Sequence, residues 1–355
     1  MTIIDRYVAR SVLAGSLLVL AALVALRAVV GVLRQLENVG TGSYGMLEAL
    51  TFVVTSLPRH AYEFLPIATL LGALLGLGGM AAHSELVVMR AAGISIWRLA
   101  RGAFVTGIGL AVVGFLLGDI IGPVASDYGQ RLRTLSLNQG VSLADGRSTW
   151  IKDGGRIIHL EARDASEEFG GVYVFSLDPS HRLVSVARAR TADFDDGGNL
   201  RLRDYRESAI SEKGVTLRQS TEVAQATQLR AELIDLSVND ADKLPLLPLY
   251  SYIDYLKRND LDTYSYEVAF WSRLSNLGAL AMMGALALPF VFGPLRSAAS
   301  GQRVFVGVVI GVVYFVGSRT VLGSGAVLGV DPFVLAWLPT LLLALVLAVS
   351  FRRVR

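Results

Sequence analysis

Four arginines lie within or at the ends of long apolar runs: Arg27, Arg34, Arg59 and Arg319. A charged side chain is costly inside a membrane unless it is paired, hydrated or used. The planar guanidinium group matches phosphate oxygens, so a rim of arginines above an apolar cavity would suit a ligand with anionic phosphates and acyl chains. Alternatively, these side chains snorkel to the surface or pair internally, as Arg59 could with Glu63 one helical turn away. The sequence leaves both interpretations open.

Residues 84–93, Ser-Glu-Leu-Val-Val-Met-Arg-Ala-Ala-Gly, form a short segment of mixed polarity between two apolar runs. Ser84 is expected to accept hydrogen bonds from the first-turn amides, Glu85 suits the positive end of the helix dipole, and Gly93 suits a left-handed turn that ends the helix. The segment is too short and too charged to cross a bilayer, so it is expected at or beyond the head groups. A helix of this kind usually contacts a soluble partner. The alternative is a solvated loop helix.

Several kinds of self-contained chemistry are missing from the sequence. None of the four lysines follows a glycine, so the Gly-Lys-Ser/Thr loop that cradles nucleotide phosphates is absent, and the chain is not expected to hydrolyse ATP itself. The four histidines lack helical i,i+4 spacing and no His-Glu-x-x-His occurs, which argues against a zinc protease. Cysteine is absent, which excludes disulfides and thiolate ligands. We therefore expect no catalytic residue and no metal site.

The composition is typical of a membrane protein. Hydrophobic residues make up 53% of the 355 residues and the mean hydropathy is positive, which is too apolar for a soluble domain of this size. The apolar residues gather in runs close to the roughly 20 residues that a helix needs to cross the hydrocarbon core. Glycines at residues 72–79 lie inside the second run, where small residues let helix backbones approach closely. We predict a membrane α-helical bundle with six transmembrane helices at about residues 11–33, 64–82, 103–122, 274–293, 304–322 and 333–350.

Arginine is distributed unequally between the two sides of such a bundle. If the six helices alternate, the short loops of one side hold only Arg34, Arg59 and Arg319. The opposite side holds Arg6, Arg10, Arg90, Arg98, Arg101, Arg296, Arg303, Arg352, Arg353 and Arg355. The positive-inside rule then places this richer side, with both termini and residues 84–92, in the cytoplasm.

An insertion between the third and fourth runs has the pattern of an all-β domain. Apolar and polar residues alternate at 156–160, 171–175 and 199–203, and turn-forming residues separate these stretches. Short strands at this spacing predict a sandwich or an open barrel. We expect three parts: residues 1–122 with the first three helices, the β domain at 123–266, and residues 267–355 with the last three helices.

The inserted domain has two further features. Its alternating apolar positions are expected to form an ordinary core, with a slide for acyl chains as the alternative; they are Ile157, Val172, Val174, Leu200 and Leu202. Residues 249–257 form an aromatic-rich, helix-like stretch that leads back to the membrane.

Several motifs occur together in a recognisable order. They are Asp-Arg-Tyr at 5–7, Gly-Ser-Tyr at 42–44, the glycine-rich run at 71–78, Ser-Glu-Leu-Val-Val-Met at 84–89 followed by Ala-Gly at 92–93, Trp-Ile-Lys-Asp-Gly at 150–154 and Phe-Gly-Pro-Leu-Arg-Ser at 292–297. Together they resemble the LptF/LptG permeases of the lipopolysaccharide exporter over essentially the whole chain. The Gly-Pro-Leu-Arg-Ser loop and the Ser-Glu-Leu-Val-Val-Met helix favour the LptG branch.

This resemblance implies a transmembrane subunit of an ABC transporter in the bacterial inner membrane, with a periplasmic β-jellyroll between its third and fourth helices. It implies a heterodimer with LptF, two copies of the ATPase LptB beneath, and an LptC helix beside the first span. The family extracts lipopolysaccharide from the inner membrane and passes it along the jellyrolls. ATP and magnesium would bind to the partner ATPase, so no cofactor is expected on this chain, and no nucleic acid among its partners.

The resemblance also implies two sets of site residues. Residues 84–92 would be the coupling helix that enters a groove of the ATPase, with Glu85 as the charged contact and Leu86 and Met89 as the apolar anchor. The expected coupling residues are Ser84, Glu85, Leu86, Met89 and Arg90.

For the lipid phosphates, Arg59 matches a basic position of the family at the head of the second span. Gly31, Glu37 and Asn38 stand where better-known members carry lysines, so Arg34, Arg27 or Arg319 are expected to take over this task.

Three other classes of function are alternatives. A membrane-anchored periplasmic scaffold or sensor, with no transport activity of its own, would use the β domain and leave residues 84–92 dispensable. An ion-coupled transporter would need ionisable groups near mid-membrane, where Arg27 is nearly alone. A hydrolase would need a nucleophile and a base placed together, and no motif supplies them.

Overall fold

The computed structural model describes residues 3–137, 149–162, 169–180, 182–194, 200–211, 214–225, 241, 244–292 and 300–353. Residues 195–198, whose Asp-Asp-Gly-Gly sequence predicts a turn, and most of the Phe-Gly-Pro-Leu-Arg-Ser motif therefore lie outside the described residues. The chain divides into two units, residues 1–134 with 264–355, and residues 135–263. Each unit is described by itself.

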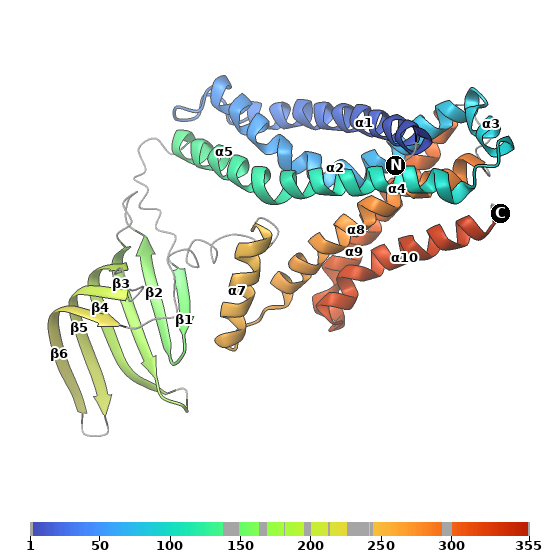
Figure 1. The fold of residues 1–355 in the computed structure, drawn as a ribbon. Helices are drawn as coiled ribbons and strands as arrows, with labels where there is room; N and C mark the ends of the chain where they lie inside the picture. The colour runs from blue at the N-terminus through green and yellow to red at the C-terminus, as the bar shows by residue number, and fades with distance from the viewer. Residues whose placement is uncertain are drawn as a thin grey trace. The chain divides into compact units, whose positions relative to one another are not determined.

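The first unit is a helical bundle (Figure 1). Its elements are α1 (Ile3–Leu36), α2 (Met46–Ala82), α3 (Glu85–Ala91), α4 (Ile96–Phe115), the π-helix η1 (Leu116–Ile121), α5 (Gly122–Leu137), α8 (Tyr264–Phe292), α9 (Ser300–Leu328) and α10 (Pro332–Arg353). Six helices are long and apolar enough to cross a membrane, with α4, η1 and α5 together forming the third. The predicted number of spans is confirmed.

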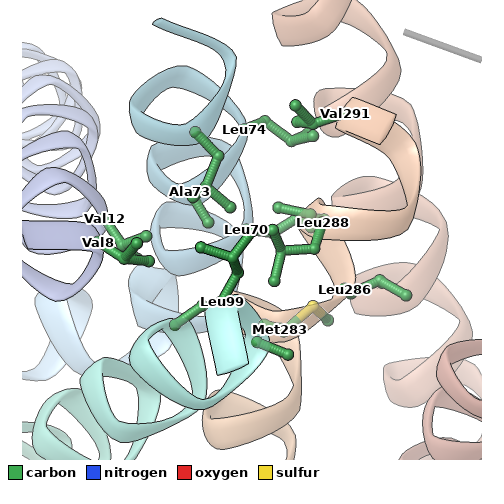
Figure 2. Packing of buried hydrophobic residues seen from close by; sticks show 14 of the residues in the cluster. Val8, Val12, Leu70, Ala73, Leu74, Leu99, Met283, Leu286, Leu288 and Val291 are labelled. Atoms are coloured by element: carbon green, nitrogen blue, oxygen red, sulfur yellow. The ribbon is translucent and has the colours of Figure 1, made fainter. Parts of the chain in front are cut away.

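The helices α2 and α8 form the centre of the bundle, because 67% of the residues in the most apolar window of each are buried, against 11% for α1 and α9. An apolar cluster joins them to α1 and α4, and Figure 2 shows its side chains converging between these four helices. The labelled members are Val8 and Val12 of α1, Leu70, Ala73 and Leu74 of α2, Leu99 of α4, and Met283, Leu286, Leu288 and Val291 of α8. Packing between these side chains holds the four helices against one another.

The third span continues beyond the predicted end at residue 122, because α5 extends to Leu137. The π-helical turn ends two residues before Pro123, whose missing N–H and ring disfavour regular α-helical hydrogen bonding to the preceding turn. Most of α5 belongs to the bundle unit, so the division between the units falls near residue 134 rather than at the sequence-based boundary of 123.

The second unit contains an antiparallel sheet of six strands, which confirms an inserted β domain. The strands are β1 (Thr149–Asp153), β2 (Arg156–Ala162), β3 (Phe169–Leu177), β4 (Leu183–Phe194), β5 (Leu200–Ser211) and β6 (Gly214–Gln225). Neighbours in sequence are neighbours in the sheet, so the described strands form a meander (Figure 1).

Four of the five expected core positions are buried in one face of the sheet: Val172, Val174, Leu200 and Leu202. The prediction for Ile157 is wrong, because Ile158 is the buried residue and Ile157 is only half-buried. Two adjacent isoleucines allow either phase of the alternation, and the pairing of Ile158 with Val174 selects the second.

The helix α7 (Leu246–Arg258) packs on β1 through polar contacts at the Trp-Ile-Lys-Asp-Gly motif. The Tyr255 hydroxyl donates to the Lys152 carbonyl at 2.7 Å, and Lys152 Nζ donates to the Asn259 carbonyl at 2.8 Å. The Asn259 side chain accepts from the Gly154 N–H at 2.8 Å. These contacts satisfy buried polar groups at the edge of the sheet.

Candidate functional site

The short helix α3 begins at a sharp corner after α2. Since α2 ends at Ala82, only His83 and Ser84 turn the chain, and Ser84 takes a left-handed conformation with φ of 60°. The prediction that the Ser84 hydroxyl caps the helix is wrong, because this side chain makes no capping hydrogen bond. Its carbonyl oxygen instead accepts the N–H of Val88 at 3.0 Å.

The C-terminal end of α3 is formed as the sequence predicted, with a left-handed residue after the helix. Gly93 is left-handed, with φ of 83°. Its N–H donates to the Arg90 carbonyl at 3.0 Å, and the N–H of Ile94 donates to the Met89 carbonyl at 3.1 Å. This pair of hydrogen bonds is the Schellman motif, which satisfies the last carbonyls of a helix.

The two faces of α3 have different roles. Leu86 is only 1% exposed and lies in the bundle core, and Met89 packs against the same cluster. These residues were expected to anchor the ATPase, but the structure turns Leu86 inward, where it holds α3 to the bundle. Val87 and Val88 point outward instead, and Val88 is 65% exposed. Arg90 is also exposed.

Glu85 connects α3 to the first helix. Its Oε2 accepts a hydrogen bond of 2.9 Å from the Tyr7 hydroxyl of α1. Nearby in the sequence, Trp97 of α4 stacks on Phe351 of α10 with the ring centroids 4.8 Å apart. Figure 1 shows α3 at the end of the bundle where both ends of the chain lie. A force on α3 would therefore reach α1, α2 and α4 directly.

The expected basic rim is only partly assembled. The carboxylate of Glu63 lies 3.6 Å from the Arg59 side chain and 3.5 Å from the His60 ring. The positive charge of Arg319 also interacts electrostatically with this carboxylate. Arg319 also lies over the ring of Phe315, 5.4 Å from its centroid. Arg59 is thus paired with Glu63, and the charge of Arg319 acts on the same carboxylate from farther away.

Arg27 and Arg34 lie apart from that group, on α1. The guanidinium group of Arg27 extends one turn along α1 toward Gly31, where a Cβ atom would be 3.5 Å away. This is the direction expected of a side chain that snorkels toward the Leu36 end of the helix. Arg34 is exposed.

A further basic residue at this end of the bundle was missed by sequence reasoning. Arg133 of α5 lies over the ring of Phe52, 5.4 Å from its centroid, and hydrogen-bonds the hydroxyl of Tyr44. Burial raises the pKa of this Tyr44 hydroxyl, although the charge of Arg133 opposes the rise. The signal was the helical pattern of residues 123–137, which were assigned to the β domain. In the described ranges, no three His, Asp or Glu side chains are grouped closely enough to hold a metal ion.

The profile of one protein family, described as "Lipopolysaccharide export system permease LptF/LptG", matches residues 6–353 of this chain. The chain belongs to the LptF/LptG family. It is 32% identical to the LptG permease protein of Escherichia coli K12 over 340 residues, which cover 95% of this chain and 94% of that protein. It is 28% identical to LptG of Haemophilus influenzae, with 96% and 95% covered. Against LptF of E. coli K12 the identity is 26% over 266 residues, with 70% of each chain covered.

Membership of the LptF/LptG family makes this chain a permease of the lipopolysaccharide export system, a transporter subunit rather than an enzyme. The higher identity and longer coverage with LptG than with LptF confirm the LptG branch. Together with the six candidate spans, the family indicates a multi-pass protein of the inner membrane. Nothing in these comparisons supports the alternative of a scaffold or sensor.

Proposed function

We propose that this LptG-type permease lifts lipopolysaccharide out of the inner membrane and passes it to a periplasmic bridge, driven by ATP hydrolysis in a separate subunit. The observation that carries the proposal is the family match across residues 6–353, which includes all six spans and the inserted sheet. The partners would be LptF as the second permease, an LptB dimer that binds ATP and magnesium, and LptC. Both termini would be cytoplasmic and the β domain periplasmic.

The helix α3 is the proposed contact with the ATPase. Its apolar contact is assigned to Val87 and Val88, because these side chains point outward while Leu86 is buried. Glu85 and Arg90 supply charge at the two ends of the helix. The attachment of Glu85 to Tyr7 supports a rigid link between this contact and α1.

The proposed site for the lipid phosphates is the basic rim, formed by Arg59 and Arg319. Arg27, Arg34 and Arg133 are proposed as additional basic contacts outside this pair. The proximity of Arg59 and Arg319 to one carboxylate supports this assignment, since phosphate could replace or join Glu63 as their anionic partner. Photocrosslinking of lipopolysaccharide from positions 34 and 319, stronger than from lipid-facing positions on α9, is the expected result.

The whole proposal is tested by reconstituting the chain with its partner permease and the ATPase in proteoliposomes and measuring ATP-dependent release of lipopolysaccharide. Glu85→Arg and Val88→Asp are expected to lower ATPase co-purification by about tenfold, the effect of losing roughly 1.4 kcal/mol at an interface. His83→Gln, at the exposed corner before α3, is the matched control and should bind normally. Wild-type binding and transport by both α3 variants would remove the coupling assignment.

A further inference from the structure

A largely buried ion pair joins the third and fourth spans. Arg273 Nη1 of α8 lies 2.8 Å from Asp119 Oδ1 of η1, and the two side chains are only 16% and 12% exposed. Charges inside a membrane bundle are rare and usually serve function. A buried pair is also weak evidence for stability, because well-packed apolar residues of similar volume often stabilise as well or better. A role other than stability is therefore to be sought for these two charges.

The second span joins the same place through Tyr62. The Tyr62 ring lies against Gly118 of η1, where a Cβ atom would be 2.8 Å from a ring carbon. The Tyr62 hydroxyl hydrogen-bonds the side chain of Asn276, which follows Arg273 by one helical turn. Three elements, α2, η1 and α8, thus meet at one polar contact. A π-helical turn at such a place is typical of functional sites.

This contact lies beside the basic rim. Arg59 precedes Tyr62 by three residues on α2, and Glu63 follows it. Gly122, the residue directly after the π-helix, lies close to the backbone of Arg59, since a Cβ atom on it would lie 3.6 Å from the Arg59 N and Cα atoms. Any shift of η1 relative to α8 would therefore move the part of α2 that carries Arg59 and Glu63.

The chain connectivity adds a second reason for this role. Asp119 lies on the helix that leads into residues 135–263, and Arg273 lies on the helix that returns from them. The ion pair thus ties together the two helices through which the inserted unit is attached to the bundle.

We propose that Asp119 and Arg273 are positioning residues for the phosphate site: their ion pair, acting through Tyr62, holds the second span so that Arg59 and Arg319 meet the lipid phosphates. The inference rests on the proposed function, because it concerns the same rim. A merely structural pair would be replaceable by apolar residues without loss of lipid binding.

The test uses the reconstituted complex with a photoreactive phenylalanine analogue at position 315, next to the Arg319 guanidinium group. The double variant Asp119→Leu with Arg273→Met removes both charges together, so that neither stays behind without the other. It is expected to keep the unfolding temperature of the complex within a few degrees of wild type. Crosslinking of lipopolysaccharide is expected to fall by about tenfold, which corresponds to roughly 1.4 kcal/mol.

A second variant, Tyr62→Phe, keeps the ring against Gly118 and removes only the hydrogen bond to Asn276. Crosslinking should fall by about fivefold while the fold is kept, since one hydrogen bond contributes about 1 kcal/mol. The control is Asp254→Asn with Arg258→Gln, an exposed ion pair on α7 that should change nothing.

The possible results distinguish an error in the positioning role of Asp119 and Arg273 from an error in the location of the phosphate site. Wild-type crosslinking by either variant in a folded complex overturns the positioning role. If the unmodified chain with the probe at 315 captures no lipopolysaccharide, the phosphate site itself is misplaced, which is a different result.

Discussion

Tyr255 shows how one buried hydroxyl controls the stability of the β domain. Its pKa is raised to about 12, first by burial and then by the charge of Asp153. The unfolded chain releases this proton near pH 10, whereas the folded chain holds it until about pH 12. The stability that this hydroxyl contributes is therefore fully present below pH 10 and is lost as the pH rises to about 12.

We expect Tyr255→Phe to lower the stability of this unit by about 1 kcal/mol at pH 8, because the hydrogen bond to Lys152 is lost. The variant should also lose less stability than wild type between pH 10 and 12. The chain has no cysteine, so Ser251→Cys on α7 gives a single site for an environment-sensitive dye that reports denaturant unfolding. Tyr250→Phe, an exposed neighbour, is the control. An equal alkaline loss in Tyr255→Phe would contradict the assignment.

Local features of single residues were predictable, whereas their tertiary directions were not. Gly93 was assigned correctly because a left-handed helix end depends on its own backbone. The inward direction of Leu86 depends on how α3 lies against α1, α2 and α4, which no local pattern contains. The sequence analysis named neither Asp119 nor Arg273, because their pairing across 154 positions appears only in the folded bundle.

The crossing of α1 and α2 is an element-scale feature that depends on glycine. A Cβ atom added to Gly72 would collide with the backbone of Gly15 and Ser16, so the two helices touch backbone to backbone. Gly79 lies on the same helix with nothing within 4 Å of such an atom. The expected packing role of this glycine run thus holds for Gly72 and Gly76, but not for Gly79.

We expect Gly72→Val to push α1 away from α2 and to destabilise the bundle by about 1–3 kcal/mol or more, the usual effect of overpacking. Gly79→Val places the same side chain in the same helix and should stay close to wild type. Thermal unfolding of both variants in detergent measures the difference. Equal unfolding temperatures would mean that α1 can move away from α2 without cost.

At this scale, hydropathy was enough to find the six spans, because an uninterrupted run of roughly 20 apolar residues is rare outside membrane-spanning helices. Strand alternation likewise located β2, β3 and β5. The predicted end of the third helix at residue 122 differs from the structure, because the sequence becomes polar there without a residue pattern that ends the helix. The helix continues as the more polar α5, and most of α5 belongs to the bundle unit.

For the whole molecule, the coupling proposal depends on the side of the membrane that each part faces. The arginine asymmetry is an argument about insertion, whereas the fold alone is compatible with either direction. Because the family match and the six spans are independent of orientation, neither can replace a direct measurement.

The absence of cysteine makes that measurement direct. We expect Ser251→Cys, on α7, to react with a membrane-impermeant maleimide added to cells whose outer membrane is opened. The reagent then enters the periplasm, where the unit that contains α7 is proposed to lie. Ala92→Cys, at the exposed end of α3, should react only after the inner membrane is also permeabilised. Val312→Cys, an exposed position in the middle of α9, should stay unlabelled in lipid under both conditions and controls for reagent that enters the bilayer. Labelling of position 92 from outside would put α3 on the side without ATP, and a nucleotide-driven partner could then not act on this helix.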